Sequence, residues 1–315
     1  MNKTSNDSLI FLHDIVKDYK SMRALNGINL QIKAGVTGLL GPNGAGKSTL
    51  IKLLLGLVKL TSGNGQILGN DLNADGRRVR NLVGYMPEDD CYIPGMSGVE
   101  VVQFAASLSG LPSIEALRRA HEILDFCGMK QERYRVIDSY STGMRQKIKF
   151  AAAIVHDPQF LILDEPTSGL DPEEREALLA RVRLLWTQCG KSVLISTHIL
   201  PDVQAICDDV VILSQGKIRL AESLETLNQT EFPSFSVRLL GNQKEFCDSM
   251  QQQGYIGEDS GVGKIVFASP DPDLPNVIWR TAKECNSKVQ SLIPARNSLE
   301  EIFMATVKEA TDANS

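Results

Sequence analysis

Residues 41–48 of this 315-residue chain read Gly41-Pro42-Asn43-Gly44-Ala45-Gly46-Lys47-Ser48. A glycine, four residues and then Gly-Lys-Ser form the pattern of a phosphate-binding P-loop. Glycines suit such a loop because backbone N–H groups must surround a phosphate with no Cβ in the way. The pattern assigns Lys47 to the β- and γ-phosphates of a nucleotide and Ser48 to Mg²⁺. We expect all eight residues, with Thr49 after them, to bind the nucleotide.

The segments on either side fit the strand-loop-helix context that this motif needs. Residues 36–40 (VTGLL) read as a short apolar strand, and residues 48–60 (STLIKLLLGLVKL) as an amphipathic helix. The start of a helix adds unpaired N–H donors and the positive end of the helix dipole. This context disfavours the alternative, a Gly-rich turn that matches by accident.

The composition excludes several classes of protein. A net charge of −5 argues against a nucleic-acid binder held by a general basic field. The six cysteines form no CxxC pair, so we expect reduced thiols and a cytoplasmic compartment. The longest apolar runs, such as residues 53–58 (LLLGLV), are far shorter than the about 20 residues of a membrane span. If the protein functions at a membrane, we expect another chain to span the bilayer.

The order of the elements predicts an α/β fold. Nearly apolar strands alternate with helices through much of the chain, which is typical of a buried parallel sheet. Two earlier strands, at residues 9–19 and 24–32, indicate an antiparallel β part at one edge. Residues from about 90 to 155 are mostly helical and read as an insertion. The predicted architecture is a P-loop NTPase core with an antiparallel β part and a helical insertion, over residues 1–230.

A composition shift near residues 231–234 marks a second domain, residues 231–315. Its pattern reads strand, helix, strand, helix, strand and predicts a small α+β domain. Residues 297–307 close the chain as an amphipathic helix, with Ser298 and Glu301 as a capping box.

Two carboxylates follow the apolar strand at residues 160–163 (FLIL). In a P-loop sheet we expect this strand beside the P-loop strand, so that Asp164 lies next to Ser48 and holds Mg²⁺. Glu165 is then placed to polarise a water in line with the γ-phosphate. The alternative, a strand that ends in solvated carboxylates, is disfavoured by the P-loop in the same chain.

Residues 140–146 (YSTGMRQ) give a third signal at the start of a predicted helix. A serine hydroxyl, small residues and exposed N–H groups suit a phosphate. An ordinary helix N-cap explains the same residues, and the pattern alone does not decide between them.

Over about residues 9–229, the chain resembles the ATP-binding cassette (ABC) ATPase family in six motifs that follow one another in the family's order. Residues 140–144 are similar to the family's LSGGQ signature, with Ser141 and Gly143 retained, and residues 161–171 (LILDEPTSGLD) end in its D-loop aspartate, Asp171. The remaining matches are the switch histidine, the adenine-stacking aromatic and the Q-loop position, which correspond to His198, Tyr19 and Glu88.

The resemblance implies an ATPase that works as a head-to-tail dimer. ATP on the P-loop of one protomer is covered by Ser141 and Gly143 of the other. Glu165 acts as general base, His198 contacts the γ-phosphate and Asp171 communicates across the interface. These roles are expectations carried by the resemblance.

Two residues depart from the family pattern. Thr142 replaces a signature glycine and adds a Cβ near a phosphate, which weakens the expected dimer contact. Glu88 replaces the usual Q-loop glutamine. Its carboxylate can still face Mg²⁺ or the attacking water, although its charge repels the γ-phosphate more strongly.

The predicted function is an ATP-binding and ATP-hydrolysing subunit that powers an ABC transporter by ATP-driven dimerisation. Residues 298–303 (SLEEIF) resemble the end of exporter ATPases that pair with a separate membrane subunit. The expected partners are a homo- or heteromeric ATPase subunit and an integral membrane permease, at the cytoplasmic face of the membrane, with ATP and Mg²⁺ as cofactors and no nucleic acid.

Two alternative functions are compatible with the sequence. A soluble ABC ATPase acting on nucleic acid or ribosomes is disfavoured by the single cassette, the absence of long coiled-coil heptads and the absence of a basic field. A weakly hydrolysing regulatory ATP-binding module is left open by the degenerate signature.

Overall fold

The computed structural model describes residues 8–20, 22–228, 233–259, 263–295, 299–300, 302–304 and 306. The chain divides into two compact units, Met1–Leu224 together with Phe303–Ser315, and Glu225–Ile302. Each unit has a hydrophobic core of its own. The predicted capping box of Ser298 and Glu301 lies outside the described residues.

A six-stranded sheet forms the centre of the first unit, in the order β10-β9-β3-β8-β7-β6. Its strands are β3 (Val36–Leu40), β6 (Val83–Met86), β7 (Phe160–Asp164), β8 (Ser192–Ser196), β9 (Asp209–Ser214) and β10 (Lys217–Ser223). All neighbours are parallel except β9 and β10, which form a hairpin. Every residue of β3, β7 and β8 is buried, as the apolar runs predicted.

One prediction about this sheet is wrong, because β7 does not lie beside the P-loop strand β3. Strand β8 pairs with both and separates them. A crossover connection tends to bring consecutive strands together, and α6 (Pro172–Cys189) links β7 to β8 in this way. The carboxyl ends of the parallel strands still share one edge, so Asp164 remains near the P-loop.

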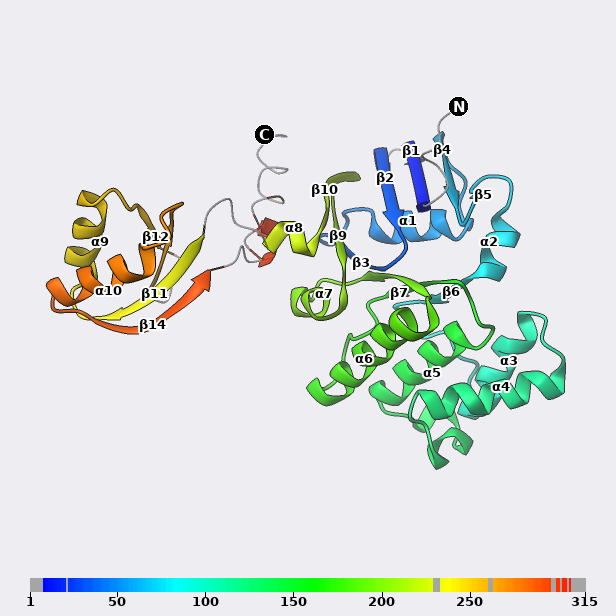
Figure 1. Ribbon diagram of the computed structural model, residues 1–315. Coiled ribbons are helices and arrows are strands. Elements are labelled where there is room, and N and C mark those ends of the chain that lie inside the picture. The colour runs from blue at the N-terminus through cyan, green and yellow to red at the C-terminus, as the bar shows by residue number, and fades with distance from the viewer. Residues whose placement is uncertain are drawn as a thin grey trace. The chain divides into compact units, whose positions relative to one another are not determined.

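A second, antiparallel sheet covers the core from the other side. It runs β2-β1-β4-β5, with β1 (Ser8–Tyr19), β2 (Met22–Lys33), β4 (Ser62–Ile67) and β5 (Asn70–Asp71). Helix α1 (Lys47–Leu54) lies between the two sheets (Figure 1) and buries Leu50, Ile51 and Leu54 in their common core. The helix is shorter than predicted because Gly56, at φ 64°, turns the chain just after it.

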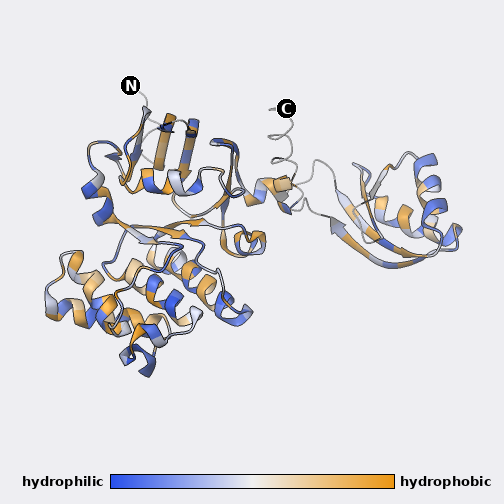
Figure 2. Ribbon diagram, turned by 180° about the vertical axis from the view of Figure 1, so that it is seen from behind, coloured by the Kyte–Doolittle hydropathy of each residue, from blue (hydrophilic) through white to orange (hydrophobic). Residues whose placement is uncertain are grey.

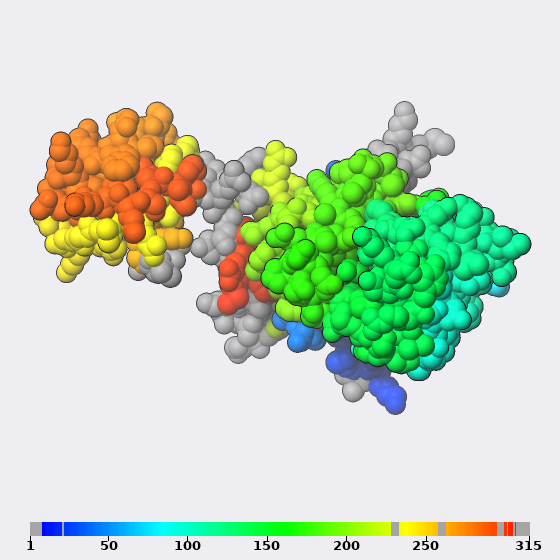
Figure 3. Space-filling view, turned by 90° about the horizontal axis from the view of Figure 1, so that it is seen from below, coloured from blue at the N-terminus to red at the C-terminus, as the bar shows by residue number. Residues whose placement is uncertain are grey.

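Helices cover the opposite face of the six-stranded sheet. They are α3 (Gly98–Leu108), α4 (Ser113–Phe126), α5 (Thr142–Ile154), α6 and α7 (Leu200–Ile206). Helix α2 (Gly76–Leu82) lies instead on the side of α1, where Val79 joins the core between the two sheets, and α8 (Leu224–Asn228) follows β10. Helices α5 and α6 pack next to the sheet, and α3 and α4 lie farther out (Figure 1); Figure 3 shows their outer surface in cyan and green. The sequence predicted the helical insertion at about residues 90–155, which contains α3, α4 and α5.

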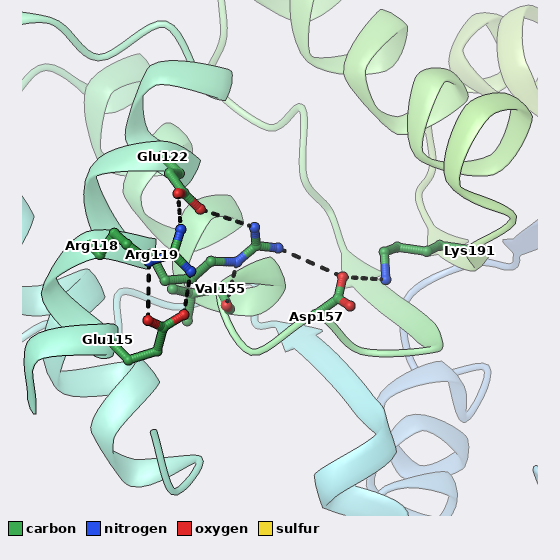
Figure 4. A network of polar contacts seen from close by, with 7 residues as sticks. All are labelled: Glu115, Arg118, Arg119, Glu122, Val155, Asp157 and Lys191. Carbon is green, nitrogen blue, oxygen red and sulfur yellow. Dashed lines mark hydrogen bonds and ion pairs between the residues drawn. The ribbon is translucent and has the colours of Figure 1, made fainter. Parts of the chain in front are cut away.

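Polar contacts attach α4 to the core (Figure 4). Arg119 Nε donates to the carbonyl oxygen of Val155 at 3.2 Å, and its guanidinium lies 3.6 Å from the Asp157 carboxylate. Lys191 Nζ, just before β8, reaches the same carboxylate at 2.8 Å. Arg118 pairs with Glu115 and Glu122 within α4. The network ties the insertion to the end of α5 and the start of β8.

The second unit is a four-stranded antiparallel sheet with two helices, as the α+β pattern predicted. Its order is β12-β13-β11-β14, from β11 (Ser234–Leu240), α9 (Gln243–Gln252), β12 (Gly257–Asp259), β13 (Lys264–Ala268), α10 (Leu274–Glu284) and β14 (Lys288–Ala295). The core of this unit forms around Phe246 and Phe267. Figure 2 marks the hydrophobic residues of its helices and strands in orange. Strand β12 was not predicted because it carries no apolar residue.

Candidate nucleotide-binding site

The P-loop joins β3 to α1 and turns tightly at its centre. The Ala45 N–H donates to the Pro42 carbonyl oxygen at 3.1 Å. Lys47 Nζ folds back over the loop and donates to the carbonyl oxygens of Gly41 at 2.6 Å and Pro42 at 3.3 Å. The ammonium group therefore lies inside the curve of the loop, where it can exchange carbonyl oxygens for phosphate oxygens.

Two glycines hold the loop close to its neighbours. A Cβ at Gly41 would lie 2.3 Å from the carbonyl oxygen of Leu213 in β9. Gly46, at φ 108°, would bring a Cβ to 2.7 Å from the carbonyl oxygen of Ala24 in β2. Neither position accepts a side chain without movement of the backbone. Both sheets therefore fix the P-loop.

The turn between β9 and β10 completes this support. The Gly216 N–H donates to the Ala45 carbonyl oxygen at 2.9 Å, and the Gly216 oxygen accepts from the Asn26 N–H at 2.8 Å. Residues far apart in the sequence thus hold one loop.

A cavity of about 750 Å³ opens over the P-loop. Of the residues predicted from the sequence, it is lined by every residue from Gly41 to Thr49 and by Glu88, Asp164, Glu165 and His198. It is also lined by residues that the sequence did not predict, namely Met22, Arg23, Ala24, Gln215, Gly216 and Phe303. The volume suits a nucleotide-sized ligand.

Asp164 ends β7 with a buried carboxyl group, 6% exposed. Burial raises the pKa of this group, and the nearby Glu88 and Glu165 carboxylates raise it further, whereas the Ser196 hydroxyl and the Lys47 ammonium lower it. The site therefore concentrates negative charge where solvent does not stabilise it, which favours a bound cation.

Glu165 and His198 form a pair at the edge of the sheet. His198 Nδ1 lies 2.9 Å from Glu165 Oε2. The Glu165 side chain is 8% exposed and that of His198 is 67% exposed. Glu165 also has φ 48°, a left-handed backbone that is rare outside glycine, and its N–H donates to the Ser196 oxygen at 2.8 Å. Such local strain is common at functional sites.

Glu88 follows β6 and is exposed at the cavity wall. Its backbone is held from α5, where Lys149 Nζ donates to the Glu88 carbonyl oxygen at 2.7 Å. The carboxylate therefore belongs to an anchored segment that reaches the cavity.

The signature and D-loop residues lie outside the cavity in the same chain. Ser141 Oγ accepts from the Met144 N–H at 3.2 Å and caps α5, so the N-cap interpretation holds, while the hydroxyl hydrogen is still available to a phosphate. Gly143 is packed against Glu174, where a Cβ would lie 1.7 Å from its carboxylate oxygen. Asp171 caps α6 by accepting from the Glu174 N–H at 2.8 Å.

Signature and D-loop are neighbours on one surface. A Cβ at Gly169 would lie 3.0 Å from the Thr142 methyl group, and Gln146 Nε2 donates to the Ser168 oxygen at 3.1 Å. Ser141, Thr142 and Asp171 are exposed. They present a face that another molecule can contact.

Tyr19 is 37% exposed and does not line the cavity. Lys17 Nζ lies 4.8 Å from the centre of its ring. Tyr19 pairs with Met22 across the turn between β1 and β2, and Met22 does line the cavity. No local signal in the sequence marked Met22, because it reaches the cavity only through the packing of β2 against the P-loop.

Comparison with known proteins settles the family. A family model described as "ABC transporter" matches residues 25–168. An uncharacterized ABC transporter ATP-binding protein of Nostoc sp. is 36% identical, over 96% of this chain and 90% of the relative. The chain belongs to the family of ABC transporter ATP-binding proteins. The daunorubicin/doxorubicin resistance ATP-binding protein of Streptomyces peucetius is 30% identical, over 96% of this chain and 93% of its own.

A solved structure supports the same assignment. CbiO1 from Clostridium perfringens, part of the ABC transporter complex CbiONQ, is 28% identical with a TM-score of 0.63, over 69% of this chain and 89% of that chain. The family makes this chain an ATP-binding ABC-type ATP hydrolase. Among the residues that the structure describes, no helix is both long and apolar enough to cross a bilayer.

Proposed function

We propose that this chain powers an exporter as one ATPase subunit of a head-to-tail dimer. The observation that carries the proposal is that the P-loop, Glu165 and His198 share one cavity, whereas Ser141 and Asp171 lie outside it on an exposed face. A second protomer, of the same or another kind, would bring those residues over the bound ATP. The γ-phosphate then joins two surfaces, and its hydrolysis separates them.

Lys47 binds the β- and γ-phosphates in this proposal, and the N–H groups from Gly44 to Thr49 surround them. Tyr19 stacks on adenine from the turn beside Met22. Gly143 of the partner faces the γ-phosphate with Ser141, while Thr142 makes the contact less close than a glycine. Asp171 reports the state of one site to the other.

The residues present fit a Mg²⁺ ion. Ser48 and Asp164 line the same cavity and offer oxygen donors, with Glu88 as an additional carboxylate. Among the described residues, no group of three or more His, Cys, Asp or Glu side chains is arranged to hold a metal by itself. This agrees with Mg²⁺ that arrives with nucleotide phosphates, because this ion is usually held by one or two carboxylates and substrate. When bound, it neutralises phosphate charge.

Glu165 acts as general base toward the attacking water. The 2.9 Å contact with His198 holds the Glu165 carboxylate, and the left-handed backbone of Glu165 constrains the residue further. His198, the more exposed partner, then contacts the γ-phosphate. Glu88, after the neighbouring strand β6, faces the water or Mg²⁺.

The segment at residues 87–90 lies between the core and the helical insertion and would report the nucleotide state to a membrane permease. Its relatives support this arrangement, since one is named for drug resistance and one is part of a transporter complex. The chain would then work at the cytoplasmic face of a membrane. We assign the second unit an accessory role in dimerisation or regulation.

The proposal is tested by purifying the Glu165→Gln protein with ATP and Mg²⁺ from gently solubilised membranes of its native cells. We expect a multi-span membrane protein to copurify. Recovery of ribosomes or nucleic acid in its place would contradict the transporter assignment. The matched control is Glu165→Gln with Lys47→Ala, which loses ATP binding and should release the membrane partner.

A further inference from the structure

One buried lysine, which holds the backbone of Glu88, has no role in the proposed function. Lys149 lies on α5, two turns after the signature, and is 4% exposed. Its Nζ donates to three successive carbonyl oxygens, of Glu88 at 2.7 Å, Pro87 at 3.0 Å and Asp89 at 3.4 Å. An ammonium group has three hydrogens to donate, so these contacts engage all of them.

A charged group is buried only where its surroundings compensate for lost water. Burial lowers the pKa of Lys149, while Cys91, Asp90, Asp89 and Glu88 act in the opposite direction. The carbonyl oxygens and these acidic neighbours all belong to the segment at residues 87–91. The groups that compensate for the lost hydration of the Lys149 ammonium therefore all come from this one segment.

Arg145, one turn earlier on α5, contacts the same segment. Its guanidinium lies 3.4 Å from the Asp90 carboxylate and 5.4 Å from the centre of the Tyr92 ring. Residues four apart lie on one face of a helix, so Arg145 and Lys149 form a continuous contact along α5. Gln146, three residues before Lys149 on α5, contacts the D-loop by donating to the Ser168 oxygen. Helix α5 thus contacts the signature, the D-loop and the Glu88 segment.

We propose that Lys149 is a positioning residue that couples the signature helix α5 to the placement of Glu88 in the nucleotide cavity. Three anchored carbonyl oxygens fix the backbone from which the Glu88 side chain projects. When a partner's nucleotide contacts Ser141 and moves α5, Lys149 carries Glu88 with it. This inference rests on the proposed role of Glu88 and on the proposed dimer.

The test is a double-mutant cycle on the full-length protein, measured by single-turnover ATP hydrolysis. Lys149→Met removes the ammonium group and keeps an unbranched side chain. We expect it to lower the hydrolysis rate about tenfold, because a small displacement of a reacting group is costly, while the Kd for ATP changes less than about twofold. In the Glu88→Ala background the same change should have no further effect, since no carboxylate is left to place.

Lys191→Met is the matched control. Lys191 Nζ also donates to a backbone carbonyl oxygen, of Pro158 at 2.7 Å, and its side chain is 15% exposed, but it lines no part of the cavity. We expect the wild-type rate. Lys149→Arg, which keeps the charge and the donors, should recover part of the lost rate. If Lys149→Met does not fold, Lys149→Gln takes its place in the cycle.

Equal losses from Lys149→Met with and without Glu88 would overturn the proposal and leave a lysine that only stabilises the fold. A normal rate for Lys149→Met would also overturn it. Failure of the proposed function looks different, because the Glu165→Gln protein with ATP and Mg²⁺ would then remain a monomer and no membrane protein would copurify with it.

Discussion

Glu165 is the proposed general base, so hydrolysis should depend on it directly. Its side chain is almost fully buried, points to His198 and stands on a left-handed backbone. Glutamine keeps the size and the hydrogen bond but cannot take a proton. We expect Glu165→Gln to bind ATP normally and to hydrolyse it about 10²- to 10⁴-fold more slowly, the usual contribution of a general base. A normal rate of phosphate release would remove Glu165 from this role.

Asp164, the proposed Mg²⁺ ligand, has a buried carboxyl group. Because its pKa is raised by burial, the folded protein holds this proton more tightly than the unfolded chain does. This group's contribution to the free energy of unfolding therefore falls as pH rises from the ordinary Asp pKa of 3.8 through the raised one.

Asp164→Asn should consequently stabilise the nucleotide-free protein at pH 7, with a rise in Tm of about 2 °C, and should abolish Mg²⁺-dependent hydrolysis. The gain in Tm should vanish below pH 3.8, where the Asp is protonated in both states. Thermal unfolding at several pH values measures it. A variant less stable than wild type at pH 7 would show that the carboxylate is well compensated in the folded protein.

At the scale of elements, helix α5 is packed against β6 at a position that accepts only glycine. A Cβ at Gly84 would lie 2.1 Å from the Ala153 carbonyl oxygen and 2.6 Å from a Leu161 methyl group. We expect Gly84→Ala to lower the free energy of unfolding by about 3 kcal/mol, because backbone must move. Urea denaturation of the first unit provides the measurement.

Gly190→Ala is the comparison for this prediction. Gly190 caps α6 at φ 65°, and a Cβ added there would meet no atom of the described residues within 4 Å beyond its chain neighbours. Only backbone strain therefore opposes the substitution, and the expected loss is about 1 kcal/mol. Similar losses at both glycines would mean that β6 and α5 adjust more easily than their contact distance indicates.

The sequence predicted those elements whose signals are local. The P-loop, the buried strands and the carboxylates after β7 follow from short patterns and from the common edge of parallel strands. The position of β8 between β3 and β7 did not follow, because strand order depends on crossovers between distant segments. Met22 and Gly216 reach the cavity because segments far apart in the sequence pack together, as the hydrogen bond from the Asn26 N–H in β2 to the Gly216 oxygen shows. The left-handed φ of Glu165 has no signature in residue type.

At the scale of the whole molecule, the two units have separate cores and each contains one of the two tryptophans. Trp186 lies on α6 in the first unit and Trp279 on α10 in the second. We expect Trp186→Phe and Trp279→Phe proteins to report two different unfolding transitions in urea. On the Glu165→Gln background, Mg²⁺ and ATP should stabilise only the transition seen by Trp186, by about 2.7 kcal/mol at 100 times Kd. An equal shift for Trp279 would show that the units unfold together.

Assembly is the other property of the whole molecule, and ATP is expected to govern it. In the proposed dimer, one protomer would provide the P-loop and the base, and its exposed signature face would complete the site of another. Glu165→Gln should preserve the ATP that would hold the protomers together. Adding Ser141→Arg should block the exposed signature face, while the cavity of the same chain stays unchanged because Ser141 does not line it. The double variant is therefore the matched control.

The decisive measurement is the molar mass of the Glu165→Gln protein in solution with ATP and Mg²⁺, compared with ADP and Mg²⁺. We expect a dimer with ATP, a monomer with ADP, and a monomer that still binds ATP when Ser141→Arg is added. A mass that does not depend on the nucleotide, with ATP shown to be bound, would contradict ATP-driven dimerisation.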